Sequence, residues 1–140
     1  MSMIPGESLK LNKTLWERMR DDVSYRAPEE ACGIIAGKSR QAKKVYVITN
    51  ALHSSTAFRM EAQEQIDAFL DIEKEDKEIL AIYHSHPTGP ETQSETDIAE
   101  FAYPGVFLLI WYKHDADWDC RNFIIDKMTV IEAGIKIDSK

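Results

Sequence analysis

The sequence predicts an α+β fold in which a mixed β-sheet is flanked by helices. Short apolar runs typical of strands are interspersed with two longer segments whose apolar residues recur every three or four positions, the spacing of one helix face. The later strands follow one another without a helical segment of comparable length, which indicates a meander. With 140 residues, of which 44% are hydrophobic, we expect a single domain over residues 1–140 with its own core.

The first predicted helix begins at Thr14, because Thr14 and Glu17 have the spacing of a capping box. Its apolar stripe consists of Leu15, Met19 and Val23, which lie on one helical face. This face is expected to pack on the sheet.

A second helix is predicted over residues 61–75, with Ile66, Phe69 and Leu70 directed inward. Before it, strands are expected over residues 31–37 and 43–49. After it, strands are expected over residues 78–85, 105–112, 120–126 and 128–133, and they enclose a short helix that carries Asp97.

The chemistry of the chain is concentrated in one stretch that begins with His84 and His86. Both follow an apolar strand-like run, and side chains two residues apart in a strand share a face, with Cα atoms about 7 Å apart at a rise of about 3.3 Å per residue. Ser94 and Asp97 come after a turn and open the short helix. Two imidazoles and one carboxylate form a ligand set that zinc accepts, with a fourth position left for water.

Each of these residues also has a simpler explanation. A single His is usually a hydrogen-bonded side chain, and Ser94 with Asp97 is also a common helix-capping arrangement. An acidic residue upstream favours the metal site, because Glu30 precedes a second buried strand and can take a proton from water at the metal. Together the residues predict a hydrolytic metal site.

The spacing of these residues resembles that of a known family. Pro28-x-Glu30-x-Cys32-Gly33, His84-Ser85-His86-Pro87, Ser94 and Asp97 are similar to the JAMM motif of the MPN-domain metallopeptidases, also called Mov34/PAD-1 or JAB. Asn50, Phe58-Arg59-Met60 and Tyr103-Pro104 resemble the small standalone prokaryotic members, so the likeness covers nearly the whole chain.

The resemblance implies a single JAMM/MPN domain and a role for each motif residue. His84, His86 and Asp97 correspond to the ligands of one Zn²⁺ ion, Glu30 to the general acid/base, and Ser94 to the residue that supports the tetrahedral intermediate. Glu29 adjoins Glu30, and Glu30 is chosen because the family's Glu lies two residues before the Cys-Gly pair.

The implied function is a zinc metallopeptidase, a deubiquitinase-like isopeptidase or peptidase. Its substrate would be a ubiquitin-like or sulfur-carrier protein, cut after the C-terminal Gly-Gly. For Arg59, two roles remain open, namely positioning a substrate tail and forming a surface ion pair. A non-catalytic MPN scaffold that binds protein partners is the main alternative. A zinc deaminase is disfavoured because the sequence lacks the Pro-Cys-x-x-Cys motif of that chemistry.

Composition restricts the partners and the cellular compartment. A net charge of −7 and a pI near 5.1 argue against nucleic-acid binding. The longest apolar run, residues 106–112, is too short to cross a membrane, and the first residues lack a signal-peptide core, so we expect a cytoplasmic protein without membrane association. Cys32 and Cys120 are widely separated, so we expect no disulfide and a buried Cys32 near the site.

Overall fold

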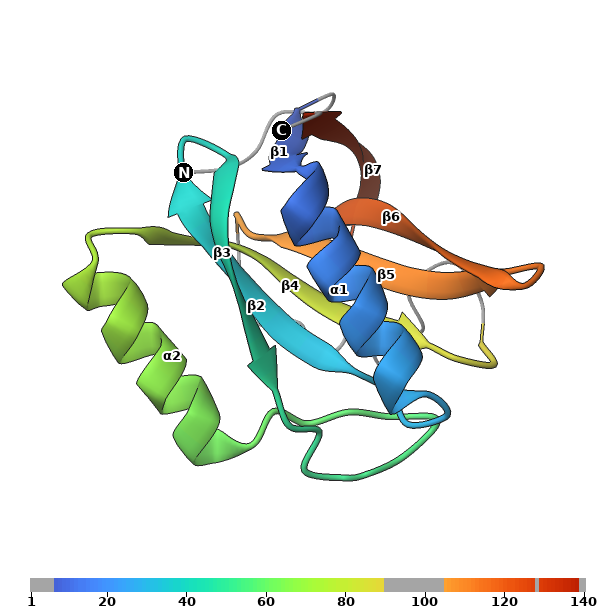
Figure 1. The fold of residues 1–140 in the computed structure, drawn as a ribbon. Helices are drawn as coiled ribbons and strands as arrows, with labels where there is room; N and C mark the ends of the chain where they lie inside the picture. The colour runs from blue at the N-terminus through green and yellow to red at the C-terminus, as the bar shows by residue number, and fades with distance from the viewer. Residues whose placement is uncertain (1–6, 90–104, 128, 139–140) are drawn as a thin grey trace.

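A computed structural model describes residues 7–89, 105–127 and 129–138 of the chain. These residues form two helices and seven strands (Figure 1). In chain order the elements are β1 Ser8–Asn12, α1 Lys13–Arg26, β2 Cys32–Lys38, β3 Gln41–Ile48, α2 Ala62–Lys74, β4 Glu78–His86, β5 Phe107–His114, β6 Asp117–Asp126 and β7 Thr129–Asp138.

The strands form one mixed sheet that closes into a barrel in the order β1-β3-β2-β4-β5-β6-β7. The β1–β3, β1–β7 and β4–β5 pairs are parallel, and the other neighbours are antiparallel. The prediction of an α+β fold with a mixed sheet and helices is therefore confirmed. Strand β1 was not predicted, and it explains why β7 continues beyond residue 133, since β1 pairs with residues 134–138.

Helix α1 begins one residue before the predicted start and has a different cap. Asn12 is the N-cap residue, and its side-chain oxygen accepts a hydrogen bond from the Leu15 amide at 2.8 Å. The assignment of the cap to Thr14 was therefore wrong, because β1 delivers Asn12 in an extended conformation directly before the first helical turn. The predicted stripe is confirmed, since Met19 and Val23 are buried and Leu15 packs against the same cluster.

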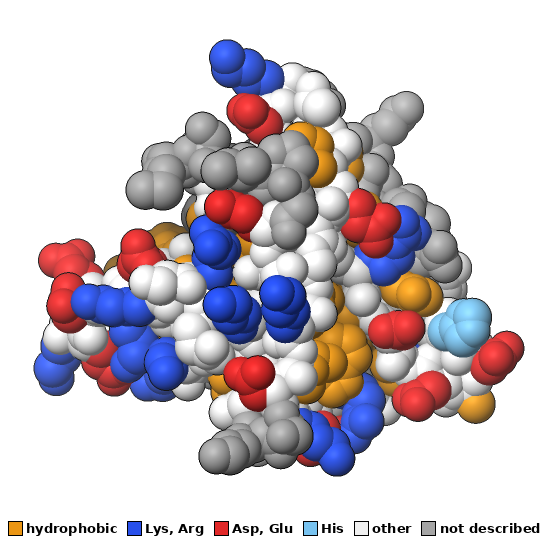
Figure 2. Space-filling view, turned by 90° about the horizontal axis from the view of Figure 1, so that it is seen from above, with side chains coloured by type: hydrophobic (Ala, Val, Ile, Leu, Met, Phe, Trp, Pro, Cys, Tyr) orange, Lys and Arg blue, Asp and Glu red, His pale blue; other side chains and the backbone are white. Residues whose placement is uncertain are grey.

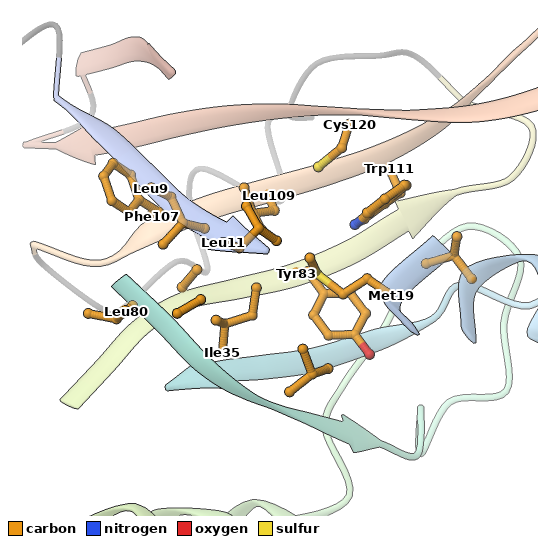
Figure 3. Close-up of a cluster of buried hydrophobic side chains, with 14 of the residues drawn as sticks. Leu9, Leu11, Met19, Ile35, Leu80, Tyr83, Phe107, Leu109, Trp111 and Cys120 are labelled. Carbon is orange, nitrogen blue, oxygen red and sulfur yellow. The ribbon is translucent and has the colours of Figure 1, made fainter. Parts of the chain in front are cut away.

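The main core lies between α1 and the sheet, where side chains from distant parts of the chain converge (Figure 3). The tilted rings of Trp16 and Trp111, with centroids 4.7 Å apart, connect the helix to β5. The largest side chains of this core are Leu9, Leu11, Met19, Ile35, Tyr83, Phe107, Leu109 and Trp111, all essentially inaccessible to solvent.

Helix α2 covers a second cluster on the other face of β2 and β4. Because side chains alternate along a strand, Ile34 and Ile82 face α2 while their neighbours face the main core. The helix buries Ala68 and Ile72, with Phe69 partly buried against them. Ile66 and Leu70, which were predicted to point inward, are 49% and 60% exposed. The buried face is thus rotated relative to the predicted one and has a smaller residue at its centre.

Acidic and basic side chains are interspersed on the face seen from above, with hydrophobic side chains between them (Figure 2). Some charged side chains of the described residues form ion pairs, for example Arg121 with Glu132 across β6 and β7 and Lys44 with Asp71 between β3 and α2. In the part of the chain that the structure describes, no helix is long and apolar enough to cross a membrane.

Candidate metal centre

Strand β4 carries the two histidines at its C-terminal end, on the face that also carries Ile82. The strand is hydrogen-bonded on both sides, and His84 lies opposite Cys32 of β2 and Ile110 of β5. The Nε2 atoms of His84 and His86 are 3.0 Å apart, and both side chains are buried. The alternation of the strand therefore brings both imidazoles to one point, as the sequence predicts.

Glu30 reaches the same point from the entrance of β2. Ligand atoms of Glu30, His84 and His86 lie within 4.8 Å of one another, and Glu30 is only 4% exposed. A carboxylate is rarely so deeply buried without a partner. The cluster therefore places a carboxylate directly beside two imidazole rings.

Glu29 lies apart from this cluster. Its Oε2 atom is 3.3 Å from the Nδ1 atom of His53, and the side chains of both residues are partly or largely exposed. Of the two adjacent glutamates, the structure thus brings Glu30 and not Glu29 to the histidines.

The other two predicted site residues, Ser94 and Asp97, lie outside the described residues, as does the short helix predicted around Asp97. The expected roles of these residues remain predictions from the sequence.

The loop between β3 and α2 supports the cluster, and its contribution was not predicted. The Phe58 ring stacks on His84, with ring centroids 4.6 Å apart and an interplanar angle of 24°. Asn50 is fully buried and organises the loop, because its Oδ1 atom accepts hydrogen bonds from the amides of Leu52 and Arg59. The sequence signal was present, since Asn followed by polar and small residues favours such turns, but it did not reveal the contact with the site.

Cys32 is the first residue of β2, two residues after Glu30, and is fully buried, as expected. Its Sγ atom is 3.4 Å from the Ile48 carbonyl oxygen, and burial raises the pKa of the thiol to about 12. Because the thiolate is the form that binds metals and reacts as a nucleophile, Cys32 serves here as a small buried residue. Cys32 and Cys120 are both free, which confirms the prediction that they form no disulfide.

The described donors suit a metal ion with a preference for nitrogen and oxygen ligands. Two nitrogen ligands about 2.0–2.1 Å from one tetrahedral zinc ion would be about 3.3–3.4 Å apart, close to the observed 3.0 Å separation of the two Nε2 atoms. Imidazole nitrogen with a nearby carboxylate is a combination that suits zinc. The cluster therefore fits a metal ion.

Comparison with protein families agrees with this geometry. The model of the prokaryotic homologues of the JAB domain matches residues 12–123. The chain belongs to this family. The matched segment runs from the N-cap of α1 to Phe123 in β6 and so includes Glu30, His84 and His86, and the resemblance inferred from the motif is confirmed at the level of the family.

Curated relatives of this JAB-family chain are named as a desampylase, a probable conjugate-cleaving protease and a peptidase. It is 33% identical over 82 residues to a desampylase of Pyrococcus furiosus, a match that covers 58% of this chain and 59% of that protein. It is 36% identical over 97 residues to a probable TtuB-protein conjugate cleaving protease of Thermus thermophilus, covering 68% and 64%. The matches therefore span less than two thirds of these two relatives. A CysO-cysteine peptidase of Mycobacterium tuberculosis is 28% identical over 113 residues, covering 79% and 77%.

Solved structures show the same fold. A protein from Desulfitobacterium hafniense superimposes with a TM-score of 0.83 at 29% identity, over 94% of this chain and 93% of that one. A JAB1/MPN domain protein from Archaeoglobus fulgidus superimposes with a TM-score of 0.60 at 16% identity, over 95% and 100%. The JAB/MPN fold is thus shared well beyond close sequence similarity.

Proposed function

We propose that this chain is a zinc-dependent hydrolase, an isopeptidase or peptidase that cleaves the amide bond after the C-terminal Gly-Gly of a ubiquitin-like or sulfur-carrier protein. We further propose that residues 1–140 form one domain that acts in the cytoplasm. The observation that carries the proposal is the buried convergence of Glu30, His84 and His86 at the ends of two adjacent strands.

In this proposal His84, His86 and Asp97 hold the zinc ion. A zinc ion in such a site would supply Lewis-acid chemistry, which lowers the pKa of water to about 7 and polarises a carbonyl oxygen. The Glu30 carboxylate accepts the proton of the attacking water and later delivers it to the departing amine. The hydroxyl of Ser94 donates a hydrogen bond to the developing oxyanion.

The burial of Glu30 supports this assignment of roles. The Glu30 carboxylate is nearly inaccessible to solvent and lies beside two imidazoles. Little bulk water therefore competes with it for the proton that it accepts. The names of the relatives support the substrate class, since they are a desampylase, a probable TtuB-protein conjugate cleaving protease and a CysO-cysteine peptidase.

The metal is tested by elemental analysis of purified protein. We expect about one zinc ion per chain, as for a catalytic site with three protein ligands. His84→Ala, His86→Ala and Asp97→Ala should each remove most of it. A triple variant that still binds zinc stoichiometrically would refute the ligand assignment, and a native protein that cannot be loaded with zinc would favour the non-catalytic scaffold.

The base is tested by Glu30→Gln with Glu29→Gln as the matched control. Glu30→Gln should retain zinc and its fold while activity falls at least about 10²-fold, the lower range for a general acid/base. The control should retain activity, because Glu29 pairs with His53 outside the cluster. Loss of zinc in Glu30→Gln would instead identify Glu30 as a ligand, and loss of activity only in Glu29→Gln would exchange the roles of the two residues.

The substrate is tested with a sulfur-carrier or ubiquitin-like protein that carries a peptide extension after its Gly-Gly. We expect chelator-sensitive hydrolysis at that junction, slowed more than about tenfold when the last Gly becomes Val, because glycines without Cβ atoms fit a narrow groove. Equal cleavage of both substrates would leave the metallohydrolase intact and reject the ubiquitin-like substrate.

A further inference from the structure

The peptide bond between Glu30 and Ala31 is held at both of its polar groups by side chains. Its carbonyl oxygen, on Glu30, accepts a hydrogen bond from Asn50 Nδ2 at 3.0 Å. Its N–H, on Ala31, donates to Ser85 Oγ at 2.8 Å. This peptide lies immediately before β2, which begins at Cys32.

Both holding side chains are completely buried. Asn50 and Ser85 have no solvent-accessible surface, and they belong to two different parts of the fold, the loop after β3 and the end of β4. A buried backbone N–H or carbonyl without a hydrogen-bond partner costs free energy. Here the two side chains supply these partners, in place of the backbone of a neighbouring strand. The backbone N–H of Glu30 is also held, since it donates to the Ser54 carbonyl at 2.8 Å.

Ser85 occupies the position between the two histidines, and strand alternation turns its hydroxyl to the opposite face from theirs. Its own backbone N–H donates to the Ala31 carbonyl at 3.0 Å. Ser85 thus forms two hydrogen bonds with Ala31, and the residues on either side of it are the two histidines. The distance from the backbone of Glu30 to the histidine pair is thereby fixed by direct bonds.

Asn50 connects the same peptide to the other support of the site. Besides the Glu30 carbonyl, its Nδ2 atom donates to the Ala57 carbonyl at 3.0 Å, next to Phe58, whose ring stacks on His84. A shift of Asn50 would therefore move the backbone of Glu30 and the ring packed on His84 together.

We propose that Asn50 and Ser85 are positioning residues for Glu30, which together clamp the Glu30–Ala31 peptide and so aim the Glu30 carboxylate at the reacting water. This inference rests on the proposed function, in which Glu30 transfers the proton. A proton acceptor must lie within hydrogen-bond reach of its target, and a misplacement of about 1 Å can lower a rate about 10²-fold. Neither Asn50 nor Ser85 needs to contact the substrate or the metal for this role.

The test compares Ser85→Ala, Ser85→Thr and Asn50→Asp with Tyr46→Phe as control. Ser85→Ala removes the acceptor for the Ala31 N–H, and Ser85→Thr keeps the hydroxyl. Asn50→Asp keeps the Oδ1 acceptor but loses the donor to Glu30. Tyr46→Phe also removes one side-chain hydrogen bond, from Tyr46 to Asp71 between β3 and α2, which does not involve this peptide.

Zinc content, thermal unfolding, kcat and KM are measured for each variant on the extended Gly-Gly substrate. For Ser85→Ala and Asn50→Asp, we expect kcat to fall at least about tenfold with KM within about twofold and zinc at the native level. Ser85→Thr should return kcat to within about threefold, since the hydroxyl is restored. Tyr46→Phe should keep its kcat within about twofold, since Tyr46 does not contact the peptide. If Ser85→Ala does not fold, Ser85→Cys takes its place, because the thiol sulfur is a weaker hydrogen-bond acceptor than the hydroxyl oxygen.

Hydrogen exchange of the Ala31 amide provides a readout that needs no activity. It should accelerate at least about tenfold in the folded Ser85→Ala variant, because the amide loses its acceptor. Native kcat in both Ser85→Ala and Asn50→Asp, loss of zinc from either, failure of Thr to restore kcat, or unchanged Ala31 exchange would overturn the inference. If the native protein binds zinc but cleaves no Gly-Gly substrate, the proposed function fails instead, and Ala31 exchange still decides whether Ser85 holds the peptide.

Discussion

The ion pair between Asp22 and Arg26 on α1 allows a quantitative stability prediction. Arg26 donates to Asp22 Oδ2 at 2.7 Å and also to the carbonyl oxygens of Cys32, at 2.7 Å, and of Ile48. The hydroxyl of Tyr83 donates to the same Oδ2 atom at 2.7 Å. With side-chain exposures of 15% for Arg26 and 9% for Asp22, the pair is largely removed from water.

Replacing Arg26 by Met retains an apolar side chain of similar length but removes all of these guanidinium hydrogen bonds. Asp22 is then left with Tyr83 as its remaining partner among these contacts. Breaking a buried pair costs about 3–5 kcal/mol, and the residual exposure favours the lower end, about 3 kcal/mol. A chain of this length has a free energy of unfolding of about 7–20 kcal/mol, so the variant should fold but unfold at lower denaturant.

Urea unfolding followed by tryptophan fluorescence measures this loss. With an m-value of about 2 kcal/mol per molar urea, the midpoint should decrease by about 1.5 M. Arg20→Met is the matched control, because Arg20 lies on the same helix, is 36% exposed and is 3.7 Å from Glu17. Exposed pairs contribute about 0–1 kcal/mol, so the control should change little. Equal losses in the two variants, or a loss below about 1 kcal/mol for Arg26→Met, would refute the assigned importance of the buried pair.

Three further predictions concern packing, thiol chemistry and capping. Gly33→Ala should destabilise the fold by about 1–3 kcal/mol in urea unfolding, because an added Cβ would lie 2.2 Å from Tyr83 Cε2 and 2.5 Å from a backbone oxygen. Cys32 and Cys120 should not react with thiol reagents at pH 8 in the folded protein, since both are buried and burial raises the pKa of each thiol. Because the pKa of Cys32 rises from 9.0 to about 12 on folding, its contribution to stability is present below pH 9 and is lost as the pH rises toward about 12. Asn12→Ala should reduce the free energy of unfolding by about 1 kcal/mol through loss of the N-cap.

Each of these has a result that contradicts it. Native stability of Gly33→Ala would mean that the Tyr83 ring moves aside at little cost. Rapid labelling of either cysteine without denaturant would show that its strand opens locally. If Thr14→Ala destabilises the protein more than Asn12→Ala, the cap lies at Thr14 after all.

Much of the fold could be predicted because several elements carry strong local patterns. The apolar run that ends at His84 identified β4, and the regular stripe of Met19 and Val23 identified the buried face of α1. Strand β1 was missed because it has only five residues and is stabilised by pairing with β7, which lies more than a hundred residues away in the sequence. The buried face of α2 was misplaced because Ala68, a small residue, gives a weak hydrophobic signal at the point of closest approach.

In the candidate site, too, features with a local sequence pattern could be predicted and those that depend on distant contacts could not. The pair His84 and His86 could be predicted from strand alternation alone, and Glu30 was expected beside them because it precedes a second buried strand. The resemblance to a family served to choose Glu30 over the adjacent Glu29. The supports of Glu30 could not be predicted, since Ser85 lies 54 residues from Ala31 and Asn50 lies 20 residues from Glu30. Nothing local in the sequence shows which buried side chain will meet which backbone group after folding.

The pairing of the first strand with the last constrains when the barrel can be completed. Ser8 lies beside Gly134 and Asn12 beside Asp138, so the β1–β7 pairing joins residues that are far apart in the sequence. Contacts between such distant residues form late and slow folding, because the entropy of closing the long loop is lost before the contacts compensate for it. During synthesis, β1 emerges long before its partner β7. The β1–β7 pairing can form only once β7 has left the ribosome, and until then the backbone edge of β1 that pairs with β7 is open to chaperones or to another nascent chain.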